Sequence, residues 1–415
     1  MELKSKDVEI LRELAKQYME IASLPVQREK MELWKAFNRG DRVRPMVLID
    51  QIPWYELNQN GELTGQVEHP MLRNLEAHMR QRIYQWKHFP VDMVVEPLLT
   101  IPYAASNNGY DFPMIVETLS LDSNNPVVSQ SYQNQLREEE DIAKIHDMKI
   151  TFDPVLSAEY LEQARYVFDG IVPVRQAGGA NFYLALWDIL SFHMGVNDIY
   201  YDLVDRPEFI HKIMRRITDA TLAGIHQLNE LGIVDTSENI CHCSVTYNDE
   251  LLPDFGAGKA PVTQNVWNCG MAQLFTAVSP EITEEFEVPY ISELARHYGM
   301  LYYGCCDRLD DRMDIVQKLP NLKKLSCSPW SNREAFAEKL RKDVIMSNKP
   351  TPAYLAGSAA MDRDVVVGDL QRTCRAAKAN NVNLEFILKD ISTIDYQPQR
   401  LTQWADWAME VAQNA

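Results

Sequence analysis

Positive charge is scarce in this sequence: 41 Lys and Arg stand against 59 Asp and Glu in 415 residues, a formal net charge of −18. Nucleic acids and anionic membranes are bound mainly by basic side chains that neutralise phosphates, so this charge speaks against both kinds of partner. No stretch approaches the roughly 18 apolar residues of a membrane span. The charged segment 1–7 is also unlike a signal peptide. We therefore expect a cytoplasmic protein with a small or neutral ligand.

Disulfide patterns and several familiar catalytic motifs are missing as well. The seven cysteines are odd in number and widely spread, which predicts no disulfide framework in a reducing compartment. The sequence contains no GxxxxGK[ST], GxGxxG, GxSxG or HExxH. These absences disfavour a P-loop nucleotide site, a dinucleotide fold, a serine hydrolase and a zincin.

Short apolar runs alternate with amphipathic helical patterns along most of the chain. The helical patterns include 206–231, 279–298, 308–318, 332–341 and 363–380. Such alternation through eight units is typical of an α/β fold of the (β/α)8 TIM barrel type. The eight predicted strands are 45–50, 93–96, 171–174, 232–235, 300–305, 322–327, 352–357 and 384–390.

The predicted barrel has two additions. Two helices, at 7–22 and 25–37, form an N-terminal helical extension over 1–40. The polar stretch 103–151 is the expected insertion. No linker or low-complexity tract divides the remainder, so we expect 41–415 to form one barrel domain.

In a TIM barrel the active site lies at the carboxyl ends of the strands. Polar residues that end apolar runs are therefore the first candidates for catalysis and binding, although an acid there also often caps the next helix. Aromatic side chains near the same ends are candidates for the wall of an apolar pocket, or for plain packing. The polar candidates are Asp50, Glu96, Gln176, Asn239, Cys305, Cys306, Asp307 and Asp390, and the aromatic ones include Trp54, Tyr103, Trp267 and Tyr303.

The cysteines suggest a metal or a reactive thiol. In the segment Cys241-His242-Cys243, neighbouring side chains of an extended chain point to opposite sides, so at most the two thiols share one ion. Packed thiols and a hydrogen-bonded imidazole are the alternative for this segment. Cys305 and Cys306 are better placed, because a cysteine after a strand and beside a glycine can be exposed and deprotonated.

Four stretches resemble the uroporphyrinogen decarboxylase superfamily, and within it the corrinoid-dependent methyltransferases. The resemblance extends from about residue 30 to the C-terminus and implies a TIM barrel. The stretches are DLVDRPEF (202–209), VSP (278–280) followed by EFEVPY (285–290), LYYGCC (301–306) and LSCSPW (325–330).

Departures from the superfamily pattern bear on the activity. The resemblance implies an arginine-rich loop after the first strand in the true decarboxylases, but 50–55 here has no arginine. It implies a zinc site of His-x-Cys and a later Cys in the thiol methyltransferases, where this chain has Tyr303-Gly304-Cys305 and Lys389-Asp390. A zinc ion held by Cys305, Cys306, His242 and Asp390 is left open, and simple thiol methylation is disfavoured.

The function implied by the resemblance is transfer of a methyl group from a small donor, such as an aromatic methyl ether, to the cobalt of a separate corrinoid protein. The expected catalytic residues are Glu96, His242, Asp307 and Asp390, which would protonate or coordinate the leaving oxygen. The alternatives are a cofactor-independent decarboxylase or lyase acting on a small cyclic acid, and a non-catalytic binding module. Assembly as a homodimer is left open. The expected substrate-binding residues are Asp50, Trp54, Tyr103, Gln176, Asn239, Trp267 and Tyr303.

Overall fold

The computed structural model describes residues 3–119, 129–237, 241–251, 259–357 and 360–415. Six parallel strands form its main sheet, and their residues are almost all buried. Strands buried on both faces favour continuous apolar runs, a pattern seen in two of the six, whereas the other four also bury polar side chains. In sheet order the strands are β1 (Met46–Ile49), β12 (Leu384–Leu388), β11 (Ile345–Asn348), β10 (Leu322–Cys327), β9 (Met300–Tyr303) and β8 (Trp267–Gly270).

A second parallel pair is formed by β2 (Leu99–Ile101) and β7 (Val174–Gln176). Along the chain, both strands come after β1 and before β8, the two edge strands of the main sheet. The Asp92 amide donates to the Val47 carbonyl of β1 at 3.0 Å, and an isolated bridge joins Leu184 to Gly270 of β8. The α/β class is therefore confirmed, with two linked parallel sheets; closure into one eight-stranded barrel stays a prediction.

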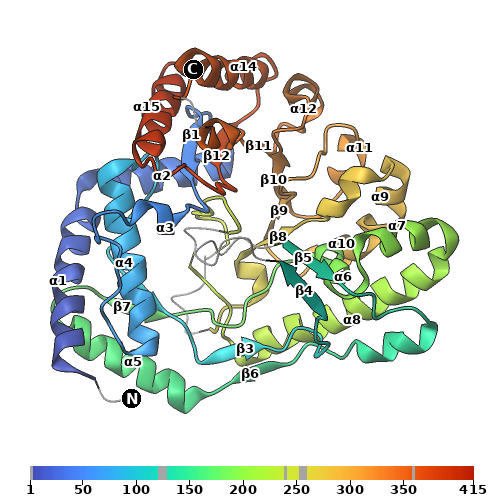
Figure 1. The fold of residues 1–415 in the computed structure, drawn as a ribbon, viewed down its shortest axis with the longest axis horizontal. Coiled ribbons are helices and arrows are strands. Elements are labelled where there is room, and N and C mark those ends of the chain that lie inside the picture. The colour runs from blue at the N-terminus through green and yellow to red at the C-terminus, as the bar shows by residue number, and fades with distance from the viewer. Residues whose placement is uncertain (1–2, 120–128, 238–240, 252–258, 358–359) are drawn as a thin grey trace.

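Helices follow most strands and lie outside the sheet (Figure 1). Several begin where the sequence places a cap: Ser279 accepts from the Ile282 amide, and Asn332 accepts from the Ala335 amide. The helices after β1 and around β7 are α3 (Trp54–Leu57), α4 (Pro70–His88), α5 (Pro154–Phe168), α6 (Leu186–Met194), α7 (Val196–Asp205) and α8 (Pro207–Leu231). Those after β8 are α9 (Pro280–Phe286), α10 (Val288–Ala295), α11 (Met313–Val316), α12 (Arg333–Lys339), α13 (Ala353–Ala356), α14 (Arg363–Ala379) and α15 (Gln399–Gln413).

The two predicted N-terminal helices are present as α1 (Ser5–Ala22) and α2 (Pro25–Arg39). In Figure 1, α1 lies at the outer edge of the molecule beside α4 and α5. Helix α2 starts with a proline in its first turn and is closed by Gly40 at φ 107°, a left-handed position that favours glycine. Trp34 and Phe37 of α2 are fully buried, so this helix is part of the core.

The polar stretch 103–151 leaves the parallel sheets and forms short antiparallel pairs. Strand β3 (Ala105–Asn107) pairs with β6 (Ile150–Phe152), and β4 (Val116–Leu119) pairs with β5 (Ser129–Tyr132). A 3-10 helix, η1 (Glu139–Lys144), begins with three acidic residues, Glu139, Glu140 and Asp141.

The predicted strands at 45–50, 300–305, 322–327 and 384–390 are present, and that at 171–174 starts only at Val174. Three others are wrong. The segments 93–96 and 232–235 form no strand, and 352–357 contains helix α13. Strands β8 and β11 were not predicted because they bury polar side chains, among them Asn268, Ser347 and Asn348. The predicted helix 279–298 is divided into α9 and α10, and that at 308–318 shortens to α11.

A charged pair lies in the interior between β10 and β12. Lys324 and Glu385 are both fully buried, and their Nζ–Oε2 distance is 2.9 Å. Ser244 donates to the same carboxylate at 2.8 Å and accepts from Lys324 at 2.7 Å. The ammonium also lies 5.4 Å from the ring centroids of Trp34 and Phe37, which ties α2 to the sheet.

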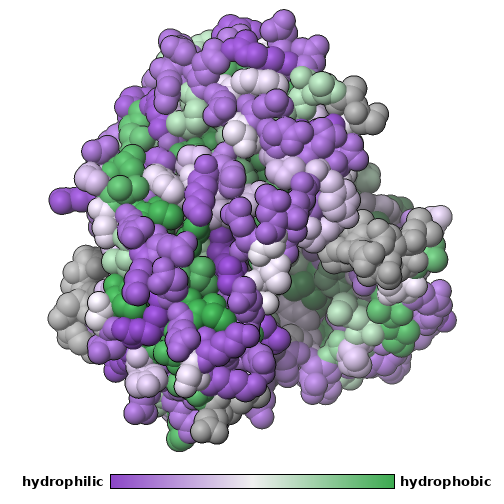
Figure 2. Space-filling model, turned by 60° about the vertical axis from the view of Figure 1, so that its left-hand side comes forward, coloured by the Kyte–Doolittle hydropathy of each residue, from purple (hydrophilic) through white to green (hydrophobic). Residues whose placement is uncertain are grey.

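The molecular surface is mainly polar, as the many charged residues of the sequence predict. Figure 2 shows a face covered mainly by hydrophilic residues, with apolar residues in small groups. Among the described residues, no helix is both long and apolar enough to cross a bilayer.

Candidate active site

A polar cluster lies where β9 and β12 end. The sulfur of Cys305, two residues beyond β9, is 2.8 Å from the Lys389 ammonium, which directly follows β12. The imidazole Nε2 of His242 is 3.1 Å from the same sulfur. Cys306 Sγ lies 3.6 Å from Cys305 Sγ and 2.9 Å from Asp390 Oδ2. The structure therefore brings together four predicted site residues and one that was not predicted, Lys389.

His242 reaches the cluster because its segment is a tight turn. Cys241 and Ser244 exchange backbone hydrogen bonds at 2.9 and 3.1 Å, and His242 has a φ of 57°. The expectation of an extended segment was therefore wrong. In the turn the imidazole faces Cys305, whereas Cys243 Sγ lies 3.7 Å from the Tyr302 hydroxyl. A non-glycine residue in a left-handed conformation is a strained position of the kind that clusters at functional sites.

The cluster stabilises one thiolate and one thiol. The pKa of Cys305 is held well below its ordinary value, first by the Cys306 thiol, then by His242 and Lys389, against the opposing effect of burial. The pKa of Cys306 is raised because the negative charge of Cys305 and Asp390 and its own burial oppose a second anion. Burial lowers the pKa of Lys389, but the neighbouring cysteines raise it more, so the ammonium persists. At neutral pH the site holds a thiolate–ammonium pair beside a protonated thiol.

Two half-buried acids, Asp50 and Asp188, interact electrostatically with this pair. Burial raises the pKa of Asp50, while His242 and Lys389 are among the charges that lower it. Burial also raises the pKa of Asp188, which accepts from the Gln273 amide and side chain at 2.9 Å. Asp50 thus lies within the electrostatic reach of the cluster, and its predicted role in substrate binding stays a prediction. Asp188 was not predicted because it lies inside α6 rather than after a strand.

Asp307 and Tyr303 support the loop rather than face the cluster. Asp307 accepts from the Cys305 amide at 2.7 Å, and burial raises its pKa to about 6. The Tyr303 hydroxyl donates to Glu287 at 3.0 Å, and burial raises the pKa of that carboxyl to about 8. Tyr303 is 1% exposed. Both residues therefore position the strand end that carries the cysteines.

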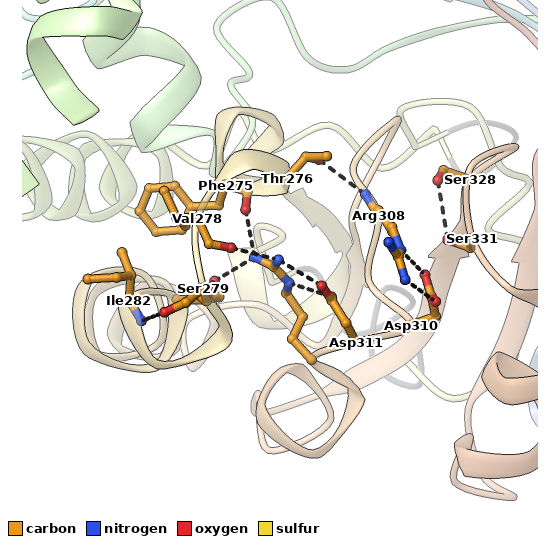
Figure 3. A network of polar contacts seen from close by, with 12 residues as sticks. Phe275, Thr276, Val278, Ser279, Ile282, Arg308, Asp310, Asp311, Ser328 and Ser331 are labelled. Carbon is orange, nitrogen blue, oxygen red and sulfur yellow. Dashed lines mark hydrogen bonds and ion pairs between the residues drawn. The ribbon is translucent and has the colours of Figure 1, made fainter. Parts of the chain in front are cut away.

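Arginine side chains fix the C-terminal part of the loop between β9 and α11. The buried Arg312 guanidinium donates to the carbonyls of Phe275 and Val278 at 2.6 and 3.0 Å. Figure 3 shows this network, with Arg308 and Asp310 forming a second pair beside it. The loop between β9 and α11 is thus held against the segment that precedes α9.

Two tyrosines flank the imidazole of His242. The Tyr183 ring lies 5.7 Å from it in an edge-on arrangement, and the Tyr302 ring lies 6.1 Å from it. Tyr183 is 47% exposed, so it marks the solvent side of the cluster. Tyr302 was among the aromatic residues considered from the sequence as a pocket wall, whereas Tyr183 was not.

Several predicted residues have other partners in the structure. Glu96 accepts from Tyr247 at 2.8 Å and lies 3.7 Å from Arg175. Gln176 donates to the Ser157 carbonyl at 2.8 Å. Tyr103 packs edge-on against Phe152, and Trp54 packs in the same way against Tyr84. Asn239 lies outside the described residues.

Trp267 is the first residue of β8, so it does not stand at a carboxyl end. It lines a cavity of about 250 Å³ that also contacts Tyr183 and Cys241. Asn181 and Asp235 border the same cavity, where the amide donates to the carboxylate at 2.7 Å. Cys305 is not among the residues that line this cavity. The cavity therefore lies next to the cysteine cluster, and Tyr183 and Cys241 border it on that side.

The donor set does not fit the zinc site that the resemblance implies. Across the described ranges, no group of three or more His, Cys, Asp and Glu side chains is arranged to hold a metal ion. The Lys389 ammonium, 2.8 Å from Cys305 Sγ and 3.1 Å from Asp390 Oδ2, already supplies the positive charge between these two groups. A dication beside it would be repelled, so these residues do not fit a zinc ion.

Lys389 was not predicted, because the polar candidates at the strand ends were acids, amides and cysteines. The signal was present in the sequence: Lys389 lies inside the predicted buried strand 384–390, where a charged side chain needs a partner. Lys389 is 1% exposed, and a buried lysine needs an anionic partner.

Comparison with known proteins supports the fold. No family model matches the chain, and no curated protein matches it. Among solved structures, a methyltransferase from Methanosarcina mazei is similar, with a TM-score of 0.52 and 11% identity. The match covers 93% of this chain and 98% of that one, so the whole architecture is shared.

Proposed function

We propose that the protein transfers a methyl group from a small methylated donor to the cobalt of a separate corrinoid protein. The observation that carries this proposal is the position of the thiolate–ammonium cluster at the carboxyl ends of parallel strands in a chain whose architecture is shared, over 93% of its length, with a methyltransferase. An eight-stranded barrel closed by β2 and β7 belongs to the same proposal.

The donor class follows from the side chains that can stabilise a leaving group. A methyl ether releases an alkoxide or phenoxide, which must receive a proton or meet a positive charge. The Lys389 ammonium, 2.8 Å from Cys305 Sγ, supplies the positive charge, and the departing oxygen then takes its proton from water. The Tyr183 and Tyr302 rings beside them suit an aromatic ether.

The methyl acceptor in this proposal is the cobalt of a second protein. Its reduced cobalt would supply the nucleophile that attacks the methyl carbon. Exposed apolar side chains follow the carboxyl ends of three strands, which suits docking at this edge: Met114 (53% exposed) in the insertion after β2, Tyr183 (47%) after β7 and Trp330 (74%) after β10.

The experiment is methylation of a reduced corrinoid protein by the purified full chain with a panel of methoxylated aromatics and methylamines. The expected result is conversion of the cobalt spectrum to the methylated form with a methoxylated aromatic donor, and recovery of the demethylated phenol. Cys374→Ser, on α14, is the control that keeps the rate. No methylation with any donor would contradict the proposal, and carbon dioxide release from a small cyclic acid without corrinoid would favour the decarboxylase alternative.

A further inference from the structure

Cys305 and Cys306 stand out among the cysteines. All seven lie in the described residues, and none is in a disulfide. Within that set, these two are the one pair whose sulfur atoms are in hydrogen-bond contact, at 3.6 Å. Cys243 and Cys327 instead contact Tyr302 and Asn348, respectively. The pair is therefore the place in this chain where oxidation can join two cysteines with the least movement.

The surroundings give the two sulfurs different roles. Lys389 and His242 both contact Cys305, and nearby positive charge makes a sulfur a better nucleophile by favouring its anion. Cys306 instead contacts the Asp390 carboxylate at 2.9 Å, which favours the neutral thiol. A charged sulfur beside a second, protonated one is the charge arrangement of an oxidation site with a resolving cysteine; because Cys305 is 4% exposed and Cys306 half-buried, this site admits only a small oxidant.

We propose that Cys305 and Cys306 form a reversible oxidation site that a hydroperoxide closes into a disulfide between adjacent residues. This inference does not depend on the proposed methyl transfer, because it concerns only the sulfur chemistry of the cluster.

The reaction has two steps, with the hydroperoxide as oxidant. The Cys305 thiolate attacks one peroxide oxygen, the O–O bond breaks, and the leaving alkoxide or hydroxide takes a proton from water, which leaves a sulfenic acid on Cys305. Cys306 then attacks the Cys305 sulfur; the S–S bond forms, the S–O bond breaks, and the hydroxyl leaves as water with the Cys306 proton. The dithiol loses two electrons, and the peroxide gains them.

The product would be easily reduced. A disulfide between neighbouring residues closes a small ring, and strained disulfides have higher reduction potentials than relaxed ones. Closure also removes the anion that holds Lys389 and His242 in place. Oxidation therefore changes the charge of the whole cluster, and a thiol reductant restores it.

The test exposes the reduced full chain to one equivalent of hydrogen peroxide, blocks free thiols with iodoacetamide and maps the tryptic peptide 297–308 by mass spectrometry. We expect this peptide to escape alkylation and to lose about 2 Da, the two thiol hydrogens, with full reversal by dithiothreitol. The matched control Cys374→Ser should behave like the natural chain. A peptide in which both cysteines remain alkylated while other cysteines are oxidised would overturn the proposal, as would a disulfide from Cys305 to Cys243.

Two further variants test the roles of Cys306 and Lys389 separately, so the proposal does not depend on the folding of one variant. Cys306→Ser should stop at the sulfenic acid, which dimedone traps, and Lys389→Met should slow oxidation at neutral pH because the Cys305 sulfur loses a cation that favours its anion. Far-UV circular dichroism checks that both are folded. An unchanged oxidation rate in folded Lys389→Met would overturn the assigned role of the ammonium.

Discussion

The ammonium of Lys389 lies 2.8 Å from the sulfur of Cys305, although β10 and β11 separate the strands that carry these two residues. In a flat sheet, three strand spacings would put the two chains about 14 Å apart. The sheet is therefore curled so strongly that the ends of β9 and β12 face each other. This curl, rather than any single loop, creates the candidate active site.

Loss of the ammonium should raise the pKa of the Cys305 thiol. In Lys389→Met the thiolate keeps the Cys306 and His242 contacts but loses a cation, so the anion becomes less favourable. We expect the pH profile for alkylation of Cys305 by iodoacetamide to lie at higher pH in the variant than in the natural chain. Lys342→Met, which removes an exposed lysine, is the control. Identical pH profiles for all three proteins would contradict this assignment.

The buried Glu287 should make the free energy of unfolding depend on pH. Its pKa is about 8 in the folded chain against 4.5 ordinarily, so between these values the folded state binds the extra proton and stability falls as pH rises. Glu287→Gln keeps an acceptor for Tyr303 and removes the titration. Between pH 5.5 and 7.5 the natural chain should lose about 2–3 kcal/mol more than the variant in urea unfolding.

The control for that comparison is Glu284→Gln, at an exposed carboxylate paired with Lys318. It should follow the pH dependence of the natural chain. A Glu287→Gln variant whose stability falls just as steeply with pH would mean that this carboxyl is ionised in the folded protein.

Breaking the interior pair of Lys324 and Glu385 should be costly. Lys324→Met leaves the fully buried carboxylate without its cation, which typically costs about 3–5 kcal/mol. The double variant Lys324→Met/Glu385→Leu removes both charges and should recover most of the loss. Urea unfolding measures both, with Lys323→Met as the control. A double variant as unstable as the single one would show that packing, not charge, dominates at this position.

Helix α2 should hold the His242 turn in place. The buried Asn38 side chain donates to the carbonyls of Val245 and Tyr247 at 3.1 and 2.8 Å. Asn38→Ala leaves these carbonyls without that donor, at a cost of about 1–3 kcal/mol. We expect faster hydrogen exchange in 241–247, measured by mass spectrometry, with exchange in β10 unchanged as the internal control. Unchanged exchange in 241–247 would contradict the anchoring role.

The sequence predicts the parts of this fold whose strands are continuous and apolar. Strands β1 and β9 lie where predicted because their residues, MVLI and MLYY, form unbroken apolar runs, whereas β11 escaped notice because Ser347 and Asn348 are buried polar residues. Burial of such groups depends on hydrogen bonds from neighbouring strands, which no local pattern reveals.

The candidate site shows the same limit. His242, Cys305, Cys306 and Asp390 were identified as candidates, but the direction of the imidazole depends on a left-handed backbone at His242. The role of Lys389 depends on a contact across the curled sheet between residues 84 positions apart. Neither the turn nor the curl can be read from spacing along the chain.

The countercharge of the Cys305 thiolate is part of the polypeptide. A bound ion leaves its site when it is diluted or chelated, whereas a side chain that follows β12 is present at a fixed effective concentration. The reactivity of Cys305 should therefore be indifferent to chelators and to the supply of metal ions, and should respond instead to the integrity of the fold that keeps the two strand ends together.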